Sequence, residues 1–353
     1  MSLPIRRCAL AALMLTLVVV LAACGSSSKS SSSGNNAAAG GNTTLRLGYF
    51  PNVTHAPAII GIENGTFAQK LGSNVKLDTK TFNAGGEAVT ALLAGAIDAS
   101  FVGPNPAINA FQKTKGDIQI VSGTASGGAY LVVKPNIKSA ADLKGKKVAT
   151  PQLGNTQDVA LRTWLNNNGL HQTKDSGDVT VVPQENSVTL TAFQQGAIQG
   201  AWVPEPWATR LVTEGGGKVL VDEATLWPKG EYTTTVLVVT KKFLGAHPDV
   251  IQNLIAGLGD AIALTKSNPA QAMQLTNQGI EKITQKKLKD NVIKASFDHI
   301  TFTEDPIASS LQKSADNAKA LGFLDSSDLS GIFDLTALNK ARQADGQPAV
   351  AST

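Results

Sequence analysis

The 353-residue sequence predicts an α/β protein built from two similar lobes that face each other across a cleft. One reason is that short apolar runs typical of strands alternate with amphipathic helical stretches and short turns, which is the pattern of a parallel sheet covered by helices. The other reason is that one passage occurs twice. VTALLAGAIDASFVGPNP at 89–106 returns 101 residues later as LTAFQQGAIQGAWVPEP at 190–206.

Each copy of this passage reads as the end of a helix, a turn at Gly95 or Gly196, a short apolar strand and a Pro-x-Pro loop. The copies are identical at six of the positions from 89 to 102, and the loops place Asn105 or Glu205 between the prolines. A chance match of a common helix–strand pattern is the alternative, because established repeat architectures have periods of about 20–50 residues.

The elements of the first unit follow one another at spacings typical of βαβ units. A strand stops at Pro51 and a helical stretch ends at Asn64-Gly65, because proline and Asn-Gly interrupt regular structure. The turn at 83–86 separates the next strand from its helix. The expected strands are 45–50, 75–82, 101–102 and 118–123, and the expected helices are 55–63 and 87–93.

The second unit repeats this plan. The loop PQLGNT at 151–156 separates a strand from a helix, and the β-branched run at 233–240 reads as a strand that leads back to the first lobe. From Pro248 onward the pattern is amphipathic and helical. The expected strands are 147–150, 179–183, 201–203 and 233–240, and the expected helices are 157–166 and 190–195. We expect lobe 1 at 44–130 plus 239–353 and lobe 2 at 131–238, with hinges where the chain crosses between them.

Residues 1–23 read as a secretory signal, with Arg6 and Arg7 before an apolar run of 13 residues. That run is shorter than the roughly 20 residues needed to span a bilayer, so a permanent transmembrane helix is the weaker interpretation. The sequence Leu-Ala-Ala-Cys at 21–24 resembles a bacterial lipobox, which predicts lipid attachment at Cys24 and anchoring to the outer face of the cell membrane. An ordinary signal peptide with an incidental cysteine is the alternative. Residues 24–43 are rich in Ser and Gly and are expected to form a flexible tether.

Charge and cysteine content argue against several classes of protein. Without residues 1–23 the chain keeps 29 basic and 27 acidic residues, a net charge of +2. A nearly neutral chain without a long basic block is not typical of nucleic-acid-binding proteins. Cys8 belongs to the signal and Cys24 to the lipid site, so the body is left without thiols for disulfides, thiolate metal sites or cysteine nucleophiles. We expect a monomer with no cofactor and no metal.

The loops that follow the predicted strands form the expected ligand site. In open parallel sheets the crevice lies at the carboxyl ends of the strands, where loops meet helix N-termini. These loops are rich in Gly, Asn, Gln, Ser and Thr and nearly free of Lys and Arg. Main-chain N–H groups and the positive end of a helix bind an oxyanion without a basic side chain, although such residues also serve as helix caps. The loops are 49–55, 83–87, 103–106, 126–128, 152–157, 184–187 and 204–207.

Glu205 stands out because it lies between two prolines and close to Trp202 and Trp207. Its carboxylate has two interpretations of equal weight, as an acceptor for a ligand ammonium group or as a partner for neighbouring backbone N–H groups. The aromatic side chains of Tyr49, Phe50, Trp202 and Trp207 are candidates for covering the alkyl part of a ligand, and at strand ends such residues are as often part of the core.

Six segments together resemble the family of substrate-binding proteins for nitrate, alkanesulfonate and taurine importers of the ABC class. They are GYFPNVTHAPA (48–58), FNAGGEA (82–88), VGPNPAINA (102–110), ASGGAYLVV (125–133), ATPQLGNTQDVALR (149–162) and WVPEPW (202–207). The resemblance covers about residues 44–300 and implies the type II periplasmic-binding-protein fold, with a ligand enclosed between two closing lobes. It implies ligand contacts at Asn83, Ala84, Gly85, Gly86, Asn105, Ser126, Gly127, Gln152, Asn155, Thr156 and Glu205. The loop positions add Tyr49, Phe50, Asn52, His55 and Glu185, and Trp202 is added as an aromatic side chain close to Glu205.

The function implied by this resemblance is that of a membrane-tethered receptor, which delivers a small organic anion such as an alkanesulfonate, taurine or nitrate to an importer permease. A thiamine-pyrimidine-like heterocycle is a second ligand class on the same fold. A secreted enzyme is an alternative from another class. Against it, the four histidines are scattered without metal-binding spacing, and the sequence contains no GxSxG nucleophile motif. A structural lipoprotein without a ligand is the last alternative.

Overall fold

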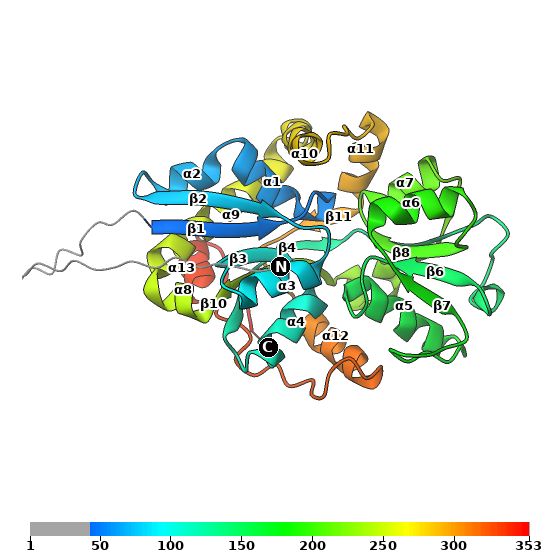
Figure 1. Cartoon of the computed structure of the whole chain (residues 1–353). Helices are drawn as coiled ribbons and strands as arrows, with labels where there is room; N and C mark the ends of the chain where they lie inside the picture. The colour runs from blue at the N-terminus through cyan, green and yellow to red at the C-terminus, as the bar shows by residue number, and fades with distance from the viewer. Residues whose placement is uncertain (1–42, 353) are drawn as a thin grey trace, which may run out of the picture. The chain divides into compact units, whose positions relative to one another are not determined.

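The computed structural model describes residues 43–352, which form two β-sheets flanked by helices (Figure 1). The predicted signal segment, Cys24 and the predicted tether up to residue 42 lie outside the described residues. The first strand, β1 (Thr43–Tyr49), begins at the last residue of that predicted tether.

The helices occupy most of the chain between the strands. They are α1 (Ala56–Glu63), α2 (Thr66–Leu71), α3 (Gly85–Leu93), α4 (Pro104–Lys113), α5 (Thr156–Asn167), α6 (Asn186–Gln194), α7 (Trp207–Thr213), α8 (Lys241–Ala246), α9 (Pro248–Ser267), α10 (Pro269–Thr284), α11 (Asp290–Asp298), α12 (Ala308–Ala320) and α13 (Thr336–Ala344), with short 3-10 turns η1 (Val53–His55), η2 (Ala141–Leu143), η3 (Glu223–Leu226) and η4 (Pro228–Gly230). Within the described range, no helix is both long enough and apolar enough to cross a membrane.

The first sheet has six strands in the order β11-β4-β10-β3-β1-β2. Strands β1, β2 (Val75–Thr81) and β3 (Ala99–Val102) are parallel, as the strand–helix alternation predicts. β10 (Thr233–Thr240) is antiparallel to β3 and to β4 (Ile118–Gly127), and β11 (Ile300–Phe302) is antiparallel to β4. The first sheet is therefore mixed rather than parallel throughout, because the chain returns from the second sheet and enters the first from the end at which β4 left it.

The second sheet has five strands in the order β7-β6-β8-β5-β9. Strands β6 (Lys147–Thr150), β7 (Thr180–Pro183) and β8 (Gly200–Pro204) are parallel. β5 (Ala129–Val133) is antiparallel to β8 and to β9 (Lys218–Asp222).

The two sheets share one topology. The run β2-β1-β3-β10-β4 corresponds position by position to β7-β6-β8-β5-β9, with an antiparallel strand at the fourth place in each. The repeated passage falls on equivalent elements, α3–β3 in one sheet and α6–β8 in the other. Both turns use a left-handed glycine, Gly95 at φ 66° and Gly196 at φ 74°, a conformation that side chains other than glycine rarely adopt. The two copies of the passage therefore form equivalent elements of the two sheets, which favours a structural repeat over a chance match of the sequences.

The chain crosses between the sheets at two places. The first crossing, between β4 and β5, passes through Gly127 and Gly128, which both have positive φ. A Cβ at Gly128 would lie 2.5 Å from Ile300 Cγ1, so glycine is required there by space as well as by conformation. The second crossing leads from η4 into β10. Because β10 pairs with β4 in the first sheet, we propose 43–127 plus 233–352 as lobe 1 and 128–232 as lobe 2. The boundary at 238 that the sequence predicts falls inside β10.

Several elements differ from the sequence prediction. The first Pro-x-Pro, predicted as a loop, forms the first turn of α4, where proline is tolerated because the first N–H groups of a helix have no intrahelical partner. The second Pro-x-Pro does lie between elements, at the end of β8 and the start of α7. The short elements α2, α7, β9 and β11 were not predicted, because runs of three to seven residues carry little periodicity.

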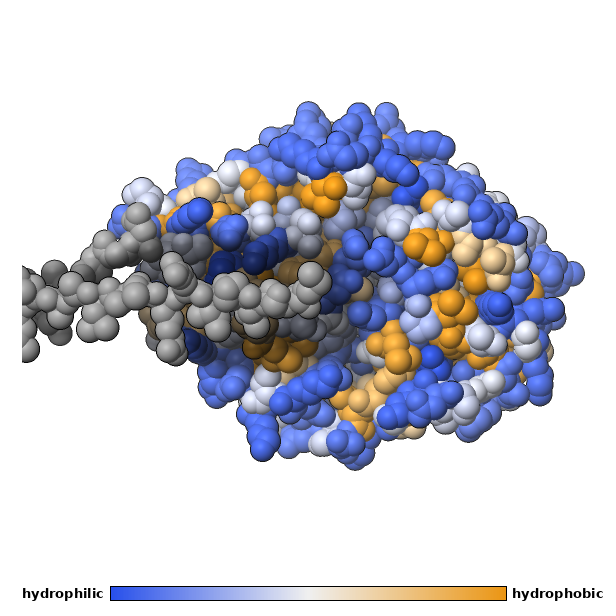
Figure 2. All heavy atoms as spheres, viewed as in Figure 1, coloured by the Kyte–Doolittle hydropathy of each residue, from blue (hydrophilic) through white to orange (hydrophobic). Residues whose placement is uncertain are grey.

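Each sheet is buried on both faces by separate apolar clusters, as expected for strands covered by helices. The surface in the view of Figure 2 is mostly hydrophilic with separate apolar areas. Among residues 43–352, four of the five exposed large apolar side chains lie in lobe 2, and they are Leu153, Val188, Val219 and Leu226.

Candidate ligand-binding site

A small cavity of about 40 Å³ lies where loops from both lobes meet, and we call it the inner cavity. Its lining comes from six of the seven loops predicted to face a ligand. The lining residues are Phe50, Asn52, Thr54, His55, Asn83, Ala84, Gly85, Gly103, Pro106, Pro151, Asn155, Thr156, Gln157, Asn186, Pro204 and Thr234. None of these lining residues is Lys or Arg.

Five helices begin at the inner cavity, namely α1, α3, α4, α5 and α6. In each case a parallel strand ends and the following helix starts within a few residues, so the N-terminal turns gather at the carboxyl ends of the strands. The first N–H groups of a helix have no intrahelical acceptor and carry partial positive charge. Only α5 has a side-chain cap, in which the Asp158 N–H donates to Asn155 Oδ1, and α1, α3, α4 and α6 have none. These helix ends therefore direct partial positive charge to the cavity without a basic side chain, while Glu87 and Asp158 lie in the first turns of α3 and α5.

His55 contributes a neutral donor to this lining. Its Nδ1 accepts a hydrogen bond from the Phe50 N–H at 3.3 Å, and its ring stacks on the Phe50 ring with centroids 4.4 Å apart. Because Nδ1 is the acceptor, the proton of the neutral ring is on Nε2. Burial lowers the pKa of His55 from 6.5 to about 3, so the ring is uncharged at physiological pH.

Asn186 has a buried side-chain oxygen without a hydrogen-bond partner in the described part of the chain. It is the first residue of α6, it is 7% exposed, and its Oδ1 is buried with no hydrogen-bond partner among the described residues. Buried polar atoms are normally satisfied, so an unpartnered amide oxygen in a cavity wall points to a hydrogen-bond donor that the chain itself does not supply, such as a water molecule or an N–H group of a ligand.

Several predicted contact residues hold the two lobes together. The Gly86 N–H donates to Gln152 Oε1 at 2.7 Å, and Asn83 Nδ2 donates to Glu185 Oε1 at 3.3 Å. A third bond joins Trp207 Nε1–H of lobe 2 to Asn52 Oδ1 of lobe 1 at 3.0 Å. These bonds surround the inner cavity, so the described arrangement is one in which the lobes are closed on each other.

Glu205 does not line the inner cavity, and both of its carboxylate oxygens have protein partners. Oε2 accepts from the Thr209 N–H and the Ser296 hydroxyl, each at 3.1 Å. Oε1 accepts from Thr209 Oγ1 at 2.8 Å and lies 2.7 Å from His299 Nδ1. Of the two interpretations of Glu205, these contacts favour bonding within the protein, including a link from lobe 2 to α11 of lobe 1.

Other predicted contact residues lie away from the inner cavity. Trp202 is fully buried in the core of lobe 2, where its Nε1–H donates to Glu223 Oε2 at 2.7 Å. Tyr49 belongs to the core of lobe 1. Ser126 and Gly127 lie at the first crossing, and the Asn105 amide donates to the Ser314 carbonyl at 3.3 Å. For Trp202 and Tyr49 the alternative of a core role is the one the structure favours.

The lining contains residues that were not named individually as contacts. Thr54, Gly103, Pro106, Gln157, Asn186 and Pro204 all fall within the predicted loops, whereas Pro151 and Thr234 fall outside them. The signal for Asn186 was present, because a polar residue directly before an apolar helix is typical of a helix start. No cluster of three or more His, Cys, Asp or Glu side chains suited to a metal ion occurs within residues 43–352.

Two α/β units of matching topology with a cavity at facing helix N-termini define the class of type II periplasmic binding proteins. Solved structures share this fold. The alkanesulfonate-binding protein SsuA from Xanthomonas axonopodis pv. citri, bound to MOPS, gives a TM-score of 0.69 at 20% identity, covering 82% of this chain and 96% of that one. The periplasmic nitrate-binding protein NrtA from Synechocystis PCC 6803 gives 0.71 at 18% identity, covering 87% and 91%.

The chain belongs to the NMT1-like family, whose sequence model matches residues 38–278. The taurine-binding periplasmic protein of Escherichia coli (strain K12) is 31% identical over 217 residues, a match that spans 60% of this chain and 64% of that protein. The chain thus matches a little under two thirds of the length of that relative.

Proposed function

We propose that this protein is the substrate-binding component of an ABC importer. It captures a small anion of the alkanesulfonate, taurine or nitrate type between its lobes and presents it to a permease. The printed names of its relatives, a taurine-binding and an alkanesulfonate-binding protein among them, support this class of ligand.

The observation that carries the proposal is the convergence of five helix N-termini on one cavity whose lining has no Lys or Arg. Oriented N–H groups and helix dipoles favour an anion at such a place. The neutral Nε2–H of His55 adds a donor that does not titrate near neutral pH. A strong acid such as a sulfonate stays ionised over the same range, so ligand and site keep complementary charge.

The energy required is modest. Micromolar capture corresponds to about −8 kcal/mol. Hydrogen bonds to a charged group contribute about 1.5–3 kcal/mol each, so several of them offset the entropy lost on binding. Because the donors come from both lobes, ligand binding stabilises the closed arrangement over an open one, and that difference is what a permease can recognise.

The relatives are periplasmic proteins, which supports a location outside the cytoplasm. We further propose that the chain is held at the outer face of the membrane by a lipid at Cys24, since residues 21–24 read as a lipobox. A monomer suffices, because both halves of the site come from one chain.

Family members are binding proteins, and we propose a binding role without catalysis for this chain. A secreted enzyme on the same fold is the alternative, and it predicts a product when the protein is incubated with a bound sulfonate. A thiamine-pyrimidine-like heterocycle is the alternative ligand.

The decisive variant is Asn186→Asp. A carboxylate at the first position of α6 favours the helix dipole, so the fold should be retained. The same charge at the cavity wall should repel an anion and weaken binding of methanesulfonate or taurine at least a hundredfold by isothermal titration calorimetry. Thr336→Asp is the matched control, because it places the same charge at the exposed first position of α13, which has the same nine-residue length as α6. Equal affinity in the Asn186→Asp variant and the wild type would refute an anion site at the inner cavity.

A further inference from the structure

We propose that an apolar contact outside the inner cavity strengthens ligand binding, because this contact forms only when the lobes close. It joins Val159, on α5 of lobe 2, to Ala318, Leu321 and Phe323, at the end of α12 of lobe 1, and we call these four residues the bridging cluster. None of them lines the inner cavity. The inference rests on the function proposed above and adds residues that control affinity without touching the ligand.

The bridging cluster differs from the other apolar clusters of residues 43–352, because each of the others contains side chains from one lobe only. Each lobe can therefore keep its own core while the lobes move apart. Val159 and Ala318 are 2% exposed and Leu321 is 4% exposed, and the Lys174 N–H of lobe 2 donates to the Leu321 carbonyl at 3.2 Å. Separation of the lobes would bring these apolar side chains into water, so their burial favours the closed arrangement.

The first half of α12 is fixed in lobe 1. Leu311 and Ala315 pack into a core cluster that lobe 1 forms alone, and the Asn105 amide at the start of α4 donates to the Ser314 carbonyl at 3.3 Å. These contacts hold α12 to the first sheet and to α4. The end of α12 therefore moves with lobe 1, and its contact with α5 is made or broken as the lobes close or open.

The C-terminal cap of α12 places Phe323 on lobe 2. Gly322 has a φ of 83°, and the Phe323 N–H donates to the Ala318 carbonyl at 2.9 Å. This is the glycine ending of a helix in which the residue after the glycine turns back over the last turn. The Phe323 ring lies against the backbone of Gly154 in lobe 2, where an added Cβ would come within 3.1 Å of the ring.

A buried ion pair holds the surface of lobe 2 that receives Phe323. Arg162 Nε lies 3.0 Å from Asp158 Oδ2, and the two side chains are 5% and 0% exposed. Asp158 also accepts from the Gly154 N–H at 3.0 Å, and the Arg162 guanidinium lies 5.8 Å from the centroid of the Phe323 ring. Because this surface is held within lobe 2, little additional ordering is needed when Phe323 packs on it.

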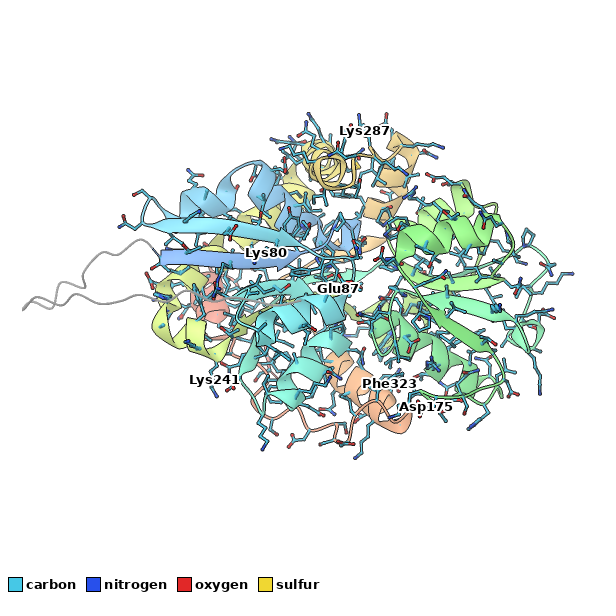
Figure 3. All side chains as sticks on the ribbon, in the orientation of Figure 1. Lys80, Glu87, Asp175, Lys241, Lys287 and Phe323 are labelled. Atoms are coloured by element: carbon cyan, nitrogen blue, oxygen red, sulfur yellow. The ribbon has the colours of Figure 1, made fainter. Side chains whose placement is uncertain are left out.

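Helix α5 connects the bridging cluster to the ligand site. Residues 155–157 at its start line the inner cavity, and Val159 follows within one helical turn. A groove of about 720 Å³ between the lobes runs beside the contact, and Phe323 and Asn155 both line it. Figure 3 shows Phe323 near Asp175 of lobe 2 at the boundary between the lobes. The bridging cluster is thus bordered by open space, and it holds the helix whose first turn faces the ligand.

Ligand affinity depends on this contact because binding and closure are linked. The observed Kd is the Kd of the closed form divided by the fraction of the protein that can close, so a lower closure equilibrium raises the observed Kd. Contacts that exist only in the closed form also slow reopening. Their loss should therefore increase the dissociation rate and leave the association rate nearly unchanged.

The first test is Phe323→Ala in the full folded chain, with methanesulfonate as the probe. We expect calorimetry to give a Kd about tenfold higher, and stopped-flow fluorescence to assign the change to faster dissociation. Phe323→Leu keeps an apolar side chain and should bind nearly as the wild type does. The matched control is Phe111→Ala, because Phe111 is also half-buried but packs on a core cluster of lobe 1 alone. Equal Kd values for Phe323→Ala and Phe111→Ala overturn the inference.

The second test, Ala318→Trp, places a bulky side chain between α12 and α5. Each lobe has its own core, so the variant should fold but close poorly, and its Kd should rise more than that of Phe323→Ala. The matched control is Ala320→Trp, which adds the same side chain at an exposed position of the same helix and should bind as the wild type does. Equal affinity of the two tryptophan variants would show that the lobes close without the bridging cluster, and it would overturn the inference.

The inference and the proposed function fail in different ways. If the wild type binds methanesulfonate and none of these variants changes the Kd, the inference is wrong and the proposed function stands. If the wild type gives no heat, the proposed function loses its support, and small-angle scattering without ligand tests the inference. The radius of gyration should be larger for Ala318→Trp than for Ala320→Trp, and equal values would overturn the inference.

Discussion

The bond between Glu205 and His299 predicts that the link between the lobes weakens as the pH rises. Glu205 is fully buried in lobe 2, and His299 follows α11 in lobe 1, with its Nδ1 2.7 Å from Glu205 Oε1. The hydrogen bond to Glu205 raises the pKa of His299 above its ordinary 6.5. A histidine whose pKa is raised by folding stabilises the folded state fully below pH 6.5, and this contribution is lost as the pH rises through the raised pKa.

The magnitude follows from the geometry of the pair. A hydrogen bond between charged groups contributes about 1.5–3 kcal/mol to stability. The His299 side chain is 40% exposed, so solvent reduces the expected value to about 1–2 kcal/mol. A neutral imidazole still donates its N–H and retains about 0.5–1 kcal/mol. The coupling between the two residues should therefore fall by about 1 kcal/mol between pH 6 and pH 9.

A double-mutant cycle measures this coupling directly. It uses urea unfolding of the wild type, Glu205→Gln, His299→Ala and the double variant at both pH values. The pair Arg210–Glu214 provides the control cycle, because it contains no imidazole and its coupling should stay constant. A Glu205–His299 coupling that is equal or larger at pH 9 would refute the reasoning, since the bond would then not depend on the imidazolium.

Two further variants test other contacts. Burial raises the pKa of Glu223 from 4.5 to about 7, so the wild type loses stability as the pH rises from 4.5 through 7. Glu223→Gln should avoid this loss and gain about 2–3 kcal/mol relative to the wild type between pH 4.5 and pH 8 in urea unfolding; parallel pH profiles would contradict it. Gln152→Ala removes the acceptor of the Gly86 N–H between the lobes and should raise the Kd for methanesulfonate about five- to tenfold; an unchanged Kd in calorimetry would show that this bond does not contribute to closure.

The sequence was informative about the elements that repeat. The helix, glycine turn and strand around Gly95 and Gly196 were predicted in both units, because local periodicity and a glycine turn are encoded in neighbouring residues. The antiparallel direction of β10 and β5 was not predicted. The direction of a strand depends on the end from which the chain enters the sheet, and the residues of the strand itself do not indicate this. The first Pro-x-Pro was assigned to a loop for a similar reason, because Pro104 fits a helix start as well as a turn.

The candidate site was predicted better as a set of loops than as single residues. Loops at strand ends converge by topology, so 83–87, 152–157 and 184–187 could be grouped without knowing a single side-chain contact. The role of each side chain depends on partners far along the chain. Glu205 bonds to Ser296 and His299, about ninety residues away, and no spacing in the sequence indicates this.

The place of β10 in the first sheet has a consequence for how the chain comes together as it is made. This strand lies between β3 and β4, yet it follows all of the second sheet in the sequence, whose last strand ends at Asp222. Synthesis runs from the N-terminus, so all strands of the second sheet are made before the first sheet has its full set of strands. Until Thr240 has emerged from the ribosome, the edges of β3 and β4 that pair with β10 have no partner strand and can pair with another chain. A chaperone that covers these edges would protect the chain during that time.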